Sequence, residues 1–183
     1  MPQRRPFNQG RRNYTPRPPI QVNLAPPVIR EKAPEAEILA IKVFDGELAA
    51  TAQALVAACD LALEKGAHLV NMSLGTANQE HEAALTAAVR RLLSAGIKVI
   101  AAGEQDGVRW LPGSLPGVWA VSLDWTLPRE ECRSSTDASG ATIFRASGYP
   151  RPIPGIPPER NLKGLSFAVA NVTGWVAARY FEM

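Results

Sequence analysis

Apolar and polar residues follow different patterns on either side of about residue 35. Before this point, isolated apolar residues are scattered among Pro, Arg, Asn and Gln. After it, short apolar runs alternate with longer segments in which apolar residues recur every three or four positions. Short runs of this kind are typical of strands buried on both faces, and the longer segments of helices with one buried face. The sequence therefore predicts a parallel α/β sheet with helices on both faces.

Five short apolar runs are predicted to form strands. They are residues 38–44, 68–75, 97–102, 118–123 and 141–146, the last of them at an edge of the sheet. The run at 68–75 is apolar until it opens at Ser73 and Gly75. Because ligands bind outside the carboxyl ends of parallel strands, we expect Ser73, Leu74 and Gly75 at a functional edge of the sheet.

Three helices are predicted between and after these strands. The first covers residues 47–65 and stops at Gly66, which fits a C-cap, and the second starts at Asn78, a residue that favours the N-cap. The last covers residues 165–181 and is small and apolar along most of its length. Before it, residues 149–158 hold five prolines and are predicted to form a loop.

Charge divides the chain at the same place. The net charge is +3, but residues 1–32 hold seven cationic residues and one acidic residue, whereas the rest holds 13 cationic and 16 acidic residues. Residues 1–34 have too little apolar surface to offset the entropy cost of ordering, so we predict an extended, basic, Pro/Arg-rich arm, followed by an α/β domain at 35–183. We expect the arm to dock on its own domain or on a partner. Nucleic-acid binding by its arginines and aromatic residues is the lesser alternative, because the domain has no nucleic-acid motif.

Several classes of site and location are not expected. No early segment has the length and apolarity of a signal peptide or of a membrane span, so we expect a cytoplasmic chain without membrane contact. Cys59 and Cys132 lack the spacing of a metal site and are expected to be thiols. Gly103 and Gly107 do not form a phosphate-binding loop. We therefore expect neither a metal nor a cofactor.

Four blocks of sequence occur in an order that suggests a family. They are Ala-Pro-Glu-Ala-Glu-Ile-Leu-Ala-Ile-Lys-Val at 33–43, Asn-Met-Ser-Leu-Gly at 71–75, Lys-Val-Ile-Ala-Ala-Gly at 98–103 and Gly-Leu-Ser-Phe-Ala-Val-Ala-Asn-Val-Thr-Gly at 164–174. Together they resemble the subtilase family of serine proteases over residues 33–180. The resemblance implies a subtilisin-like α/β core that lacks its N-terminal part.

The resemblance also assigns roles to individual residues. It puts Ser166 at the position of the nucleophile, at the start of a helix whose free N–H groups suit an oxyanion. It implies that Ser73, Leu74 and Gly75 give main-chain hydrogen bonds to an extended peptide. Glu104 and Gln105 fall in the oxyanion region, where the family has asparagine. A carboxylate at Glu104 would repel the developing charge, and Gln105 could serve only if the register of this loop shifts.

The proton-transfer groups of the family have no counterpart. A serine hydroxyl needs a neighbouring base, and the base needs an orienting partner. The family takes these from an Asp-Ser/Thr-Gly strand and a His-Gly-Thr-His helix, both of which precede the Ala-Pro block. Here that part of the sequence holds neither motif and no histidine. We expect the only histidines, His68 and His81, at the surface and away from Ser166.

Three functions remain open from the sequence. The first is a catalytically incomplete, subtilisin-like pseudoprotease that binds an extended peptide or a partner protein, for example in peptide maturation. The second is a split serine endopeptidase, in which a partner chain supplies the aspartate and the histidine and activates Ser166. In both, a homo- or hetero-oligomer could cover the sheet edge exposed by the truncation. The third is an unrelated α/β module for a small ligand.

Overall fold

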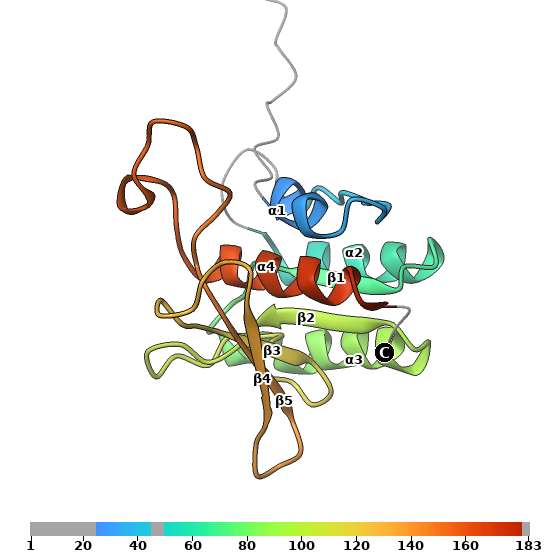
Figure 1. Ribbon diagram of the computed structural model, residues 1–183. Coiled ribbons are helices and arrows are strands. Elements are labelled where there is room, and N and C mark those ends of the chain that lie inside the picture. The colour runs from blue at the N-terminus through green and yellow to red at the C-terminus, as the bar shows by residue number, and fades with distance from the viewer. Residues whose placement is uncertain (1–24, 45–49, 181–183) are drawn as a thin grey trace, which may run out of the picture.

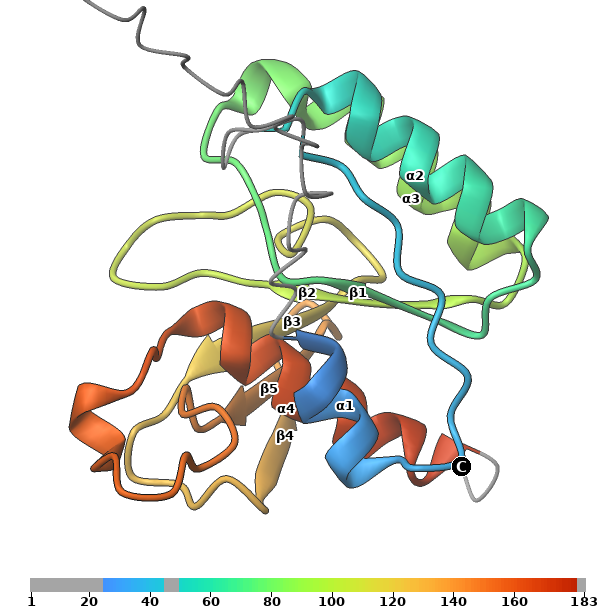
Figure 2. The same cartoon turned by 90° about the horizontal axis from the view of Figure 1, so that it is seen from above.

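A five-stranded sheet lies between two layers of helices in the computed structural model, which describes residues 25–44 and 50–180. The strand order is β1-β2-β3-β5-β4, and all neighbours are parallel except β4, which is antiparallel to β5. Helix α4 covers one face of the sheet, with α1 packed along it, and α2 and α3 cover the other face (Figures 1 and 2). The predicted parallel α/β sheet with helices on both faces is confirmed.

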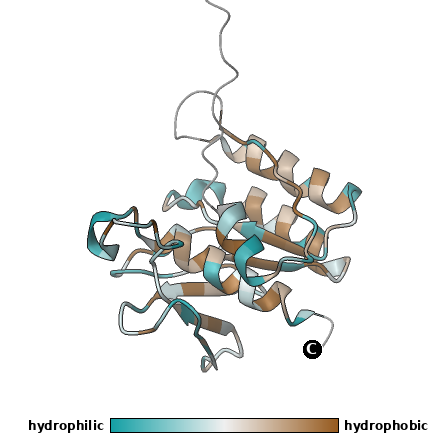
Figure 3. Ribbon diagram, turned by 45° about the horizontal axis from the view of Figure 1, so that its top comes forward, coloured by the Kyte–Doolittle hydropathy of each residue, from teal (hydrophilic) through white to brown (hydrophobic). Residues whose placement is uncertain are grey.

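The elements have the following bounds. The strands are β1 (Leu69–Met72), β2 (Lys98–Ala102), β3 (Trp119–Leu123), β4 (Cys132–Thr136) and β5 (Thr142–Ala146). The helices are α1 (Ala25–Lys32), α2 (Ala52–Glu64), α3 (Glu82–Ser94) and α4 (Leu165–Ala177), with short 3₁₀ helices η1 (Gln79–His81) and η2 (Pro158–Arg160). Hydrophobic residues are concentrated in the helices and the central strands, whereas η2 is hydrophilic (Figure 3).

The core has one apolar cluster on each face of the sheet. On the α2–α3 face, α2 buries Leu55 and Cys59, while α3 buries Leu85 and Leu92. On the other face, α4 buries four of its apolar residues, Ala168, Val169, Val172 and Val176, against Ile100 of β2, Val121 of β3 and Phe144 of β5. Residues 99–102 of β2 are buried between these two layers, which explains why they are all apolar.

Local signals in the sequence explain where the helices begin and end. The Thr51 hydroxyl accepts a hydrogen bond from the Ala54 N–H (3.1 Å) at the start of α2, and Gly66 has a φ of +66° just after its end. The Asn78 side chain accepts a hydrogen bond from the Glu80 N–H (3.0 Å) and begins η1, which leads into α3. Gly66, directly after the C-cap residue Lys65, ends α2 as predicted, whereas Asn78 caps η1 and not α3, whose N-cap is His81 and makes no side-chain cap hydrogen bond.

Two strand predictions are wrong. Residues 38–44 form no strand, because no backbone hydrogen bond joins them to another described segment, and β1 is the edge of the described sheet. Residues 141–146 are not at the edge, because the polar segment Cys132–Thr136 folds back on them as β4. A tight turn closes this hairpin: the Gly140 N–H donates to the Asp137 carbonyl (3.0 Å).

The prediction of an extended arm is wrong for residues 25–32, which the structure describes as a helix. Residues Ala25–Lys32 form α1, with proline in the first turn, where a missing N–H costs little. Val28 and Ile29 of α1 pack against Phe167 and Ala170 of α4. The rest of the predicted arm, residues 1–24, lies outside the described residues. Among the described helices, none is long and apolar enough to cross a membrane.

Candidate functional site

The candidate site lies at the carboxyl ends of the parallel strands. Residues 73–75 follow β1 there, and we call them the 73–75 edge. Residues 110–117 cover the end of β2, since a Cβ on Gly113 would lie only 1.7 Å from the Ala102 carbonyl oxygen. The start of α4 is tied to the same end of the sheet, because the Gly164 N–H donates to the carbonyl of Gly148, two residues after β5 (2.9 Å). The strands therefore bring the 73–75 edge and Ser166 to one side of the molecule.

A hydrogen-bond chain fixes the start of the 73–75 edge. The Asn71 side chain of β1 donates to the Thr173 hydroxyl of α4 (2.9 Å), and the Asn71 Oδ1 accepts from the Ser73 hydroxyl (2.6 Å) and the Ser73 N–H (3.2 Å). Beyond the edge, Thr76 exchanges backbone hydrogen bonds with Leu111 (2.9 and 3.0 Å). These hydrogen bonds fix both ends of the 73–75 edge in place.

The middle of the 73–75 edge keeps its main-chain groups available. Neither Leu74 nor Gly75 makes a backbone hydrogen bond to another described segment, and Gly75 is exposed. A Cβ on Gly75 would lie 2.7 Å from the Leu111 carbonyl oxygen, so only glycine fits there without a shift. A short, held segment with free N–H and C=O groups can pair with one extended chain.

A mostly apolar cavity of about 320 Å³ adjoins this edge. Leu74, Gly75 and Thr76 form one wall. The other walls come from the segment before α2, from α2, from η1 and from the first turn of α3: Phe44, Ala50, Ala52, Leu55, His81 and Leu85. The cavity suits an apolar side chain from a chain lying on the edge.

Ser166 lies exposed in the first turn of α4. Its hydroxyl makes no hydrogen bond with any described residue. His68 is at the other end of α4, with its ring 5.5 Å from the ring of Tyr180. At 1.5 Å per residue, the helical path from Ser166 to Tyr180 is about 20 Å. His81 is in η1 and lines the cavity on the opposite face of the sheet. The structure therefore brings neither histidine to Ser166.

Helix α1 takes the place in chain order where the resemblance asks for the histidine helix. It runs in the same direction as α4, because Val28 lies by Phe167 and Lys32 lies by Gly174. A Cβ on Gly174 would be 3.0 Å from the Lys32 Cβ, so the missing side chain permits close packing. The first turn of α1, at the Ser166 end of α4, presents Pro26 and Pro27. Neither can accept a proton.

The two residues that the resemblance assigns to the oxyanion region differ from the asparagine of the family. Glu104 is exposed, whereas the Gln105 side chain is held against β3, with its Oε1 accepting from the Leu123 N–H (3.1 Å) and its Nε2 donating to Asp106 (3.0 Å). A two-residue turn with positive φ at Asp106 (52°) and Gly107 (76°) sets this geometry. Gln105 thus uses its acceptor on β3 and one donor inside its own loop.

Sequence reasoning missed the structural role of Asn171. This side chain is fully buried, and its Nδ2 donates to the carbonyls of Ser147 (2.9 Å) and Tyr149 (3.0 Å). It holds the segment after β5 onto α4, while its Oδ1 has no partner among the described residues. A polar residue inside an apolar helix was the only signal, and it does not specify what the residue binds.

A charged cluster that anchors α1 was missed as well. The Arg129 guanidinium donates to both carboxylate oxygens of Glu31 (2.7 and 3.2 Å), and the Lys32 ammonium donates to the Arg129 carbonyl (2.7 Å). The hydrogen bond from Arg129 lowers the pKa of Glu31, and burial lowers the pKa of Lys32. Burial also raises the pKa of Cys132 to about 11. Within the described ranges, no three His, Cys, Asp or Glu side chains gather as metal ligands would.

Comparisons with known proteins extend these observations. Residues 19–141, about two thirds of the chain, match the sequence profile of the subtilase family. No curated protein matches the chain significantly. Among solved structures, the prenylagaramide maturation protease PagA is 27% identical with a TM-score of 0.55, and the match covers 74% of this chain and 52% of PagA. The patellamide maturation protease PatA is also 27% identical, with a TM-score of 0.53 and the same two coverages.

A third solved structure supports the fold alone. A lanthipeptide protease superposes with a TM-score of 0.59 at 17% identity, covering 87% of this chain and 61% of that protein. The chain spans about half the length of PagA and PatA (52% of each).

Proposed function

Because the chain belongs to the subtilase family, we propose that it binds an extended peptide along the 73–75 edge and does not hydrolyse it. Family membership removes the alternative of an unrelated α/β module for a small ligand. One observation carries the proposal. The free main-chain groups of Leu74 and Gly75 lie at the same end of the strands as Ser166, whereas His68 is at the far end of α4 and His81 lines the cavity on the opposite face of the sheet from α4.

The bound peptide would add a short strand to this edge. Leu74 and Gly75 would exchange main-chain hydrogen bonds with it, which gives affinity without selecting side chains. Selectivity would come from the adjoining cavity, whose walls are mostly apolar. Leu, Ile, Met or Phe is expected at that position of the peptide, since such side chains gain most by burial.

The absence of hydrolysis follows from chemistry at Ser166. Without a base within reach, the hydroxyl stays protonated and is a poor nucleophile. By the family resemblance, Glu104 would put a carboxylate where a developing oxyanion needs donors, and loss of one such donor typically costs a factor of about 10² to 10³ in turnover. These deficits support a binding role.

The solved relatives suggest the kind of peptide. PagA and PatA are named as maturation proteases for prenylagaramide and patellamide. We propose by analogy that this chain holds a precursor peptide for a separate maturation enzyme, in the cytoplasm. The analogy is limited to the half of those proteins that this chain spans.

The experiment compares peptides with free and with methylated backbones. Short fluorescein-labelled peptides containing a central Leu should bind the full chain, as measured by fluorescence anisotropy. N-methylation of the residues around the Leu keeps the side chains but removes N–H donors, so affinity should fall at least about tenfold. Replacing the Leu with Ser should also weaken binding. If methylated and free peptides bind equally, main-chain pairing at this edge is refuted.

A second candidate is the split endopeptidase, which the open edge of β1 favours. Within the described residues β1 pairs only with β2, and residues 37–44 run extended without a backbone partner, so a partner's strand could pair here. Against it, α1 already packs along α4 beside Ser166. A lysate fraction from the source organism that confers peptidase activity on the wild-type chain, but not on Ser166→Ala, would favour the split enzyme over the binding role.

A further inference from the structure

An exposed apolar surface lies on a different part of the molecule from the 73–75 edge. Four of the six large hydrophobic side chains that are exposed in the described residues belong to one loop and to the turn that packs against its base: Trp125 (46% exposed), Ile153 (46%), Ile156 (43%) and Leu162 (64%). Three are in the loop between β5 and α4, and Trp125 is in the turn after β3. We call these four residues the loop patch. A soluble protein rarely exposes several such side chains together without a use for them.

The loop that carries the patch is held in a defined shape. The Gly164 N–H donates to the Gly148 carbonyl (2.9 Å) at its base, and the Asn161 side chain donates to the Arg151 carbonyl (3.3 Å) higher up. Ile153 and Ile156 are in one turn, closed by a hydrogen bond from the Ile156 N–H to the Ile153 carbonyl (3.0 Å). These bonds keep the apolar side chains on a formed loop.

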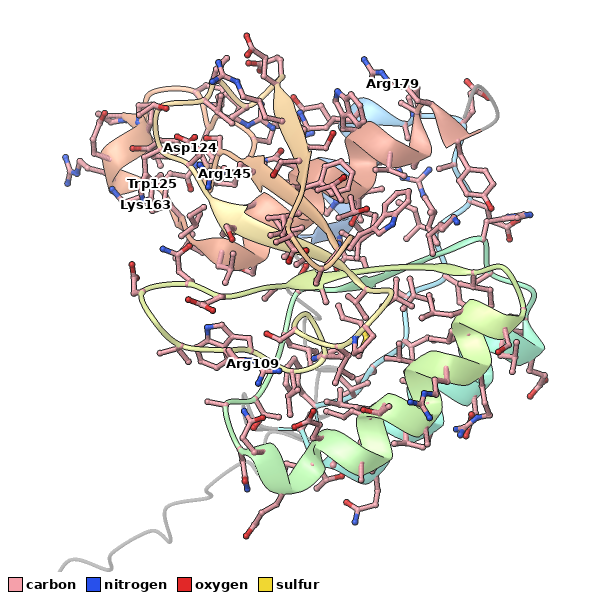
Figure 4. All side chains as sticks on the ribbon, turned by 90° about the horizontal axis from the view of Figure 1, so that it is seen from below. Arg109, Asp124, Trp125, Arg145, Lys163 and Arg179 are labelled. Atoms are coloured by element: carbon pink, nitrogen blue, oxygen red, sulfur yellow. The ribbon has the colours of Figure 1, made fainter. Side chains whose placement is uncertain are left out.

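Trp125 packs against the base of this loop. Its ring lies 5.1 Å from the ring of Tyr149 in an edge-to-face arrangement. A Cβ on Gly148 would be only 2.7 Å from the Trp125 ring, so glycine is needed for this contact. The Lys163 ammonium lies 5.9 Å from the Trp125 ring centroid and 5.6 Å from that of Tyr149. Figure 4 shows Trp125 and Lys163 side by side, with Asp124 and Arg145 next to them.

The surroundings of the patch are cationic in a domain that is otherwise acidic. Residues 145–163 contain four cations (Arg145, Arg151, Arg160, Lys163) and one carboxylate, Glu159. None of the four cations forms an ion pair with any described carboxylate. Two further acids lie near the cations: Asp124, which accepts two hydrogen bonds from Thr126 and is close enough to Arg145 to feel its charge, and Glu31, which feels the charge of Arg151. The four cations of the rim thus outnumber the three carboxylates near them, Glu159, Asp124 and Glu31, and no close ion pair to a described carboxylate occupies any of the four.

We propose that the loop patch docks an acidic peptide segment that carries aliphatic or aromatic side chains. The apolar residues of the segment would bury Ile153, Ile156 and Leu162, and its carboxylates would pair with the cationic rim. A nucleic acid would also be attracted to the positive charge, but it has little apolar surface that could bury Ile153 and Ile156. This interaction goes beyond the proposed function, and it stands or falls separately from peptide binding at the 73–75 edge.

The test uses a set of short fluorescein-labelled peptides and the full chain. The parent peptide alternates pairs of Leu and Glu, and two variants replace all Glu with Gln or all Leu with Ser. By fluorescence anisotropy, the parent should bind, and each variant should bind at least about tenfold more weakly. Raising the salt from about 0.05 to 0.5 M should weaken the parent's binding, because screening shortens the range of the charges.

Protein variants locate the site. The double change Arg160→Glu/Lys163→Glu should lower the affinity at least about tenfold, whereas Arg90→Glu, an exposed cation on α3, should not change it. If the first variant does not fold, Ile153→Ser/Ile156→Ser tests the same loop through exposed side chains. Folding is checked by circular dichroism.

Four results would overturn the proposal. The first is that the parent peptide does not bind at about 1 mM, and the second is that the Glu and Gln peptides bind equally well. The third is that Arg90→Glu loses as much affinity as Arg160→Glu/Lys163→Glu. The fourth is that an oligothymidine probe binds more tightly than the parent peptide. A concentration-dependent dimer that Ile153→Ser/Ile156→Ser dissociates would assign the patch to a second copy instead.

Discussion

Replacement of Asn171 gives the most specific test of how the loop after β5 is held on α4. Its Nδ2 makes two hydrogen bonds, to the carbonyls of Ser147 and Tyr149, inside a fully buried environment. Asn171→Ala removes both, at about 1 kcal/mol each. The cavity left by the side chain adds a cost, and removal of the unpartnered Oδ1 offsets part of it.

The net loss of unfolding free energy for Asn171→Ala is therefore expected to be about 1–3 kcal/mol. Asn171→Asp should be more destabilising at neutral pH, because an ionised carboxylate would face two carbonyl oxygens. Its cost should grow as the pH rises above about 4, where the carboxyl ionises freely in the unfolded chain. Asn171→Leu keeps the volume and tests the hydrogen bonds without a cavity.

Urea unfolding, followed by tryptophan fluorescence, measures all three variants against the wild type. The predicted order of stability at pH 7 is wild type first, then Leu and Ala, and then Asp. The reasoning would be refuted if Asn171→Asp were within about 0.5 kcal/mol of the wild type, the range expected of a surface change.

Three further predictions concern other parts of the fold. Glu31→Gln should lower stability at pH 7 and remove part of its pH dependence, because the Arg129 hydrogen bond lowers the pKa of Glu31 in the folded chain. The Glu31 contribution is present above its unfolded pKa of about 4.3 and is lost as the pH falls through the lower folded value, which acid unfolding curves can follow. Gly113→Ala should destabilise the chain by more than about 1–3 kcal/mol, because the new Cβ would meet the Ala102 backbone, and thermal unfolding measures this. Cys132, whose pKa is about 11 when folded, should react with iodoacetamide at pH 8 about 10²-fold more slowly than in urea, as read by mass spectrometry.

The Glu31 and Gly113 variants each have a matched control. Glu130→Gln removes a 75%-exposed carboxylate near the same arginine and should leave the acid unfolding curve unchanged. Gly155→Ala introduces a Cβ with open space around it at φ +78°, so only backbone strain of about 1 kcal/mol is expected. Equal effects of Gly113→Ala and Gly155→Ala, or rapid alkylation of Cys132 in the folded chain, would contradict the packing described here.

The sequence was sufficient for the elements whose apolar pattern is complete within the element. β2 is buried on both faces and α3 on one, and both patterns are legible without knowledge of their neighbours. β4 was not predictable, since Cys132–Thr136 is mostly exposed and polar and becomes a strand only by pairing with β5. Residues 38–44 are the opposite case. They have the apolar pattern of a strand, but they make no backbone hydrogen bond to any described strand.

The arm shows how composition can hide a local signal. Its prolines and arginines predict an extended segment as a whole, yet Val28 and Ile29 form an apolar pair that packs on α4. For the site, motifs located the 73–75 edge and Ser166. The hydrogen bonds of Gln105 and Asn171 depend on residues distant in sequence, so no local pattern could specify them.

The central claim is that Ser166 has no base in this chain, and its reaction with a fluorophosphonate tests the claim directly. The purified chain is incubated with the reagent at pH 8, and its intact mass is measured alongside Ser166→Ala. We predict an unchanged mass for both. A stoichiometric adduct on the wild-type chain that is absent from Ser166→Ala would show an activated nucleophile and contradict the account.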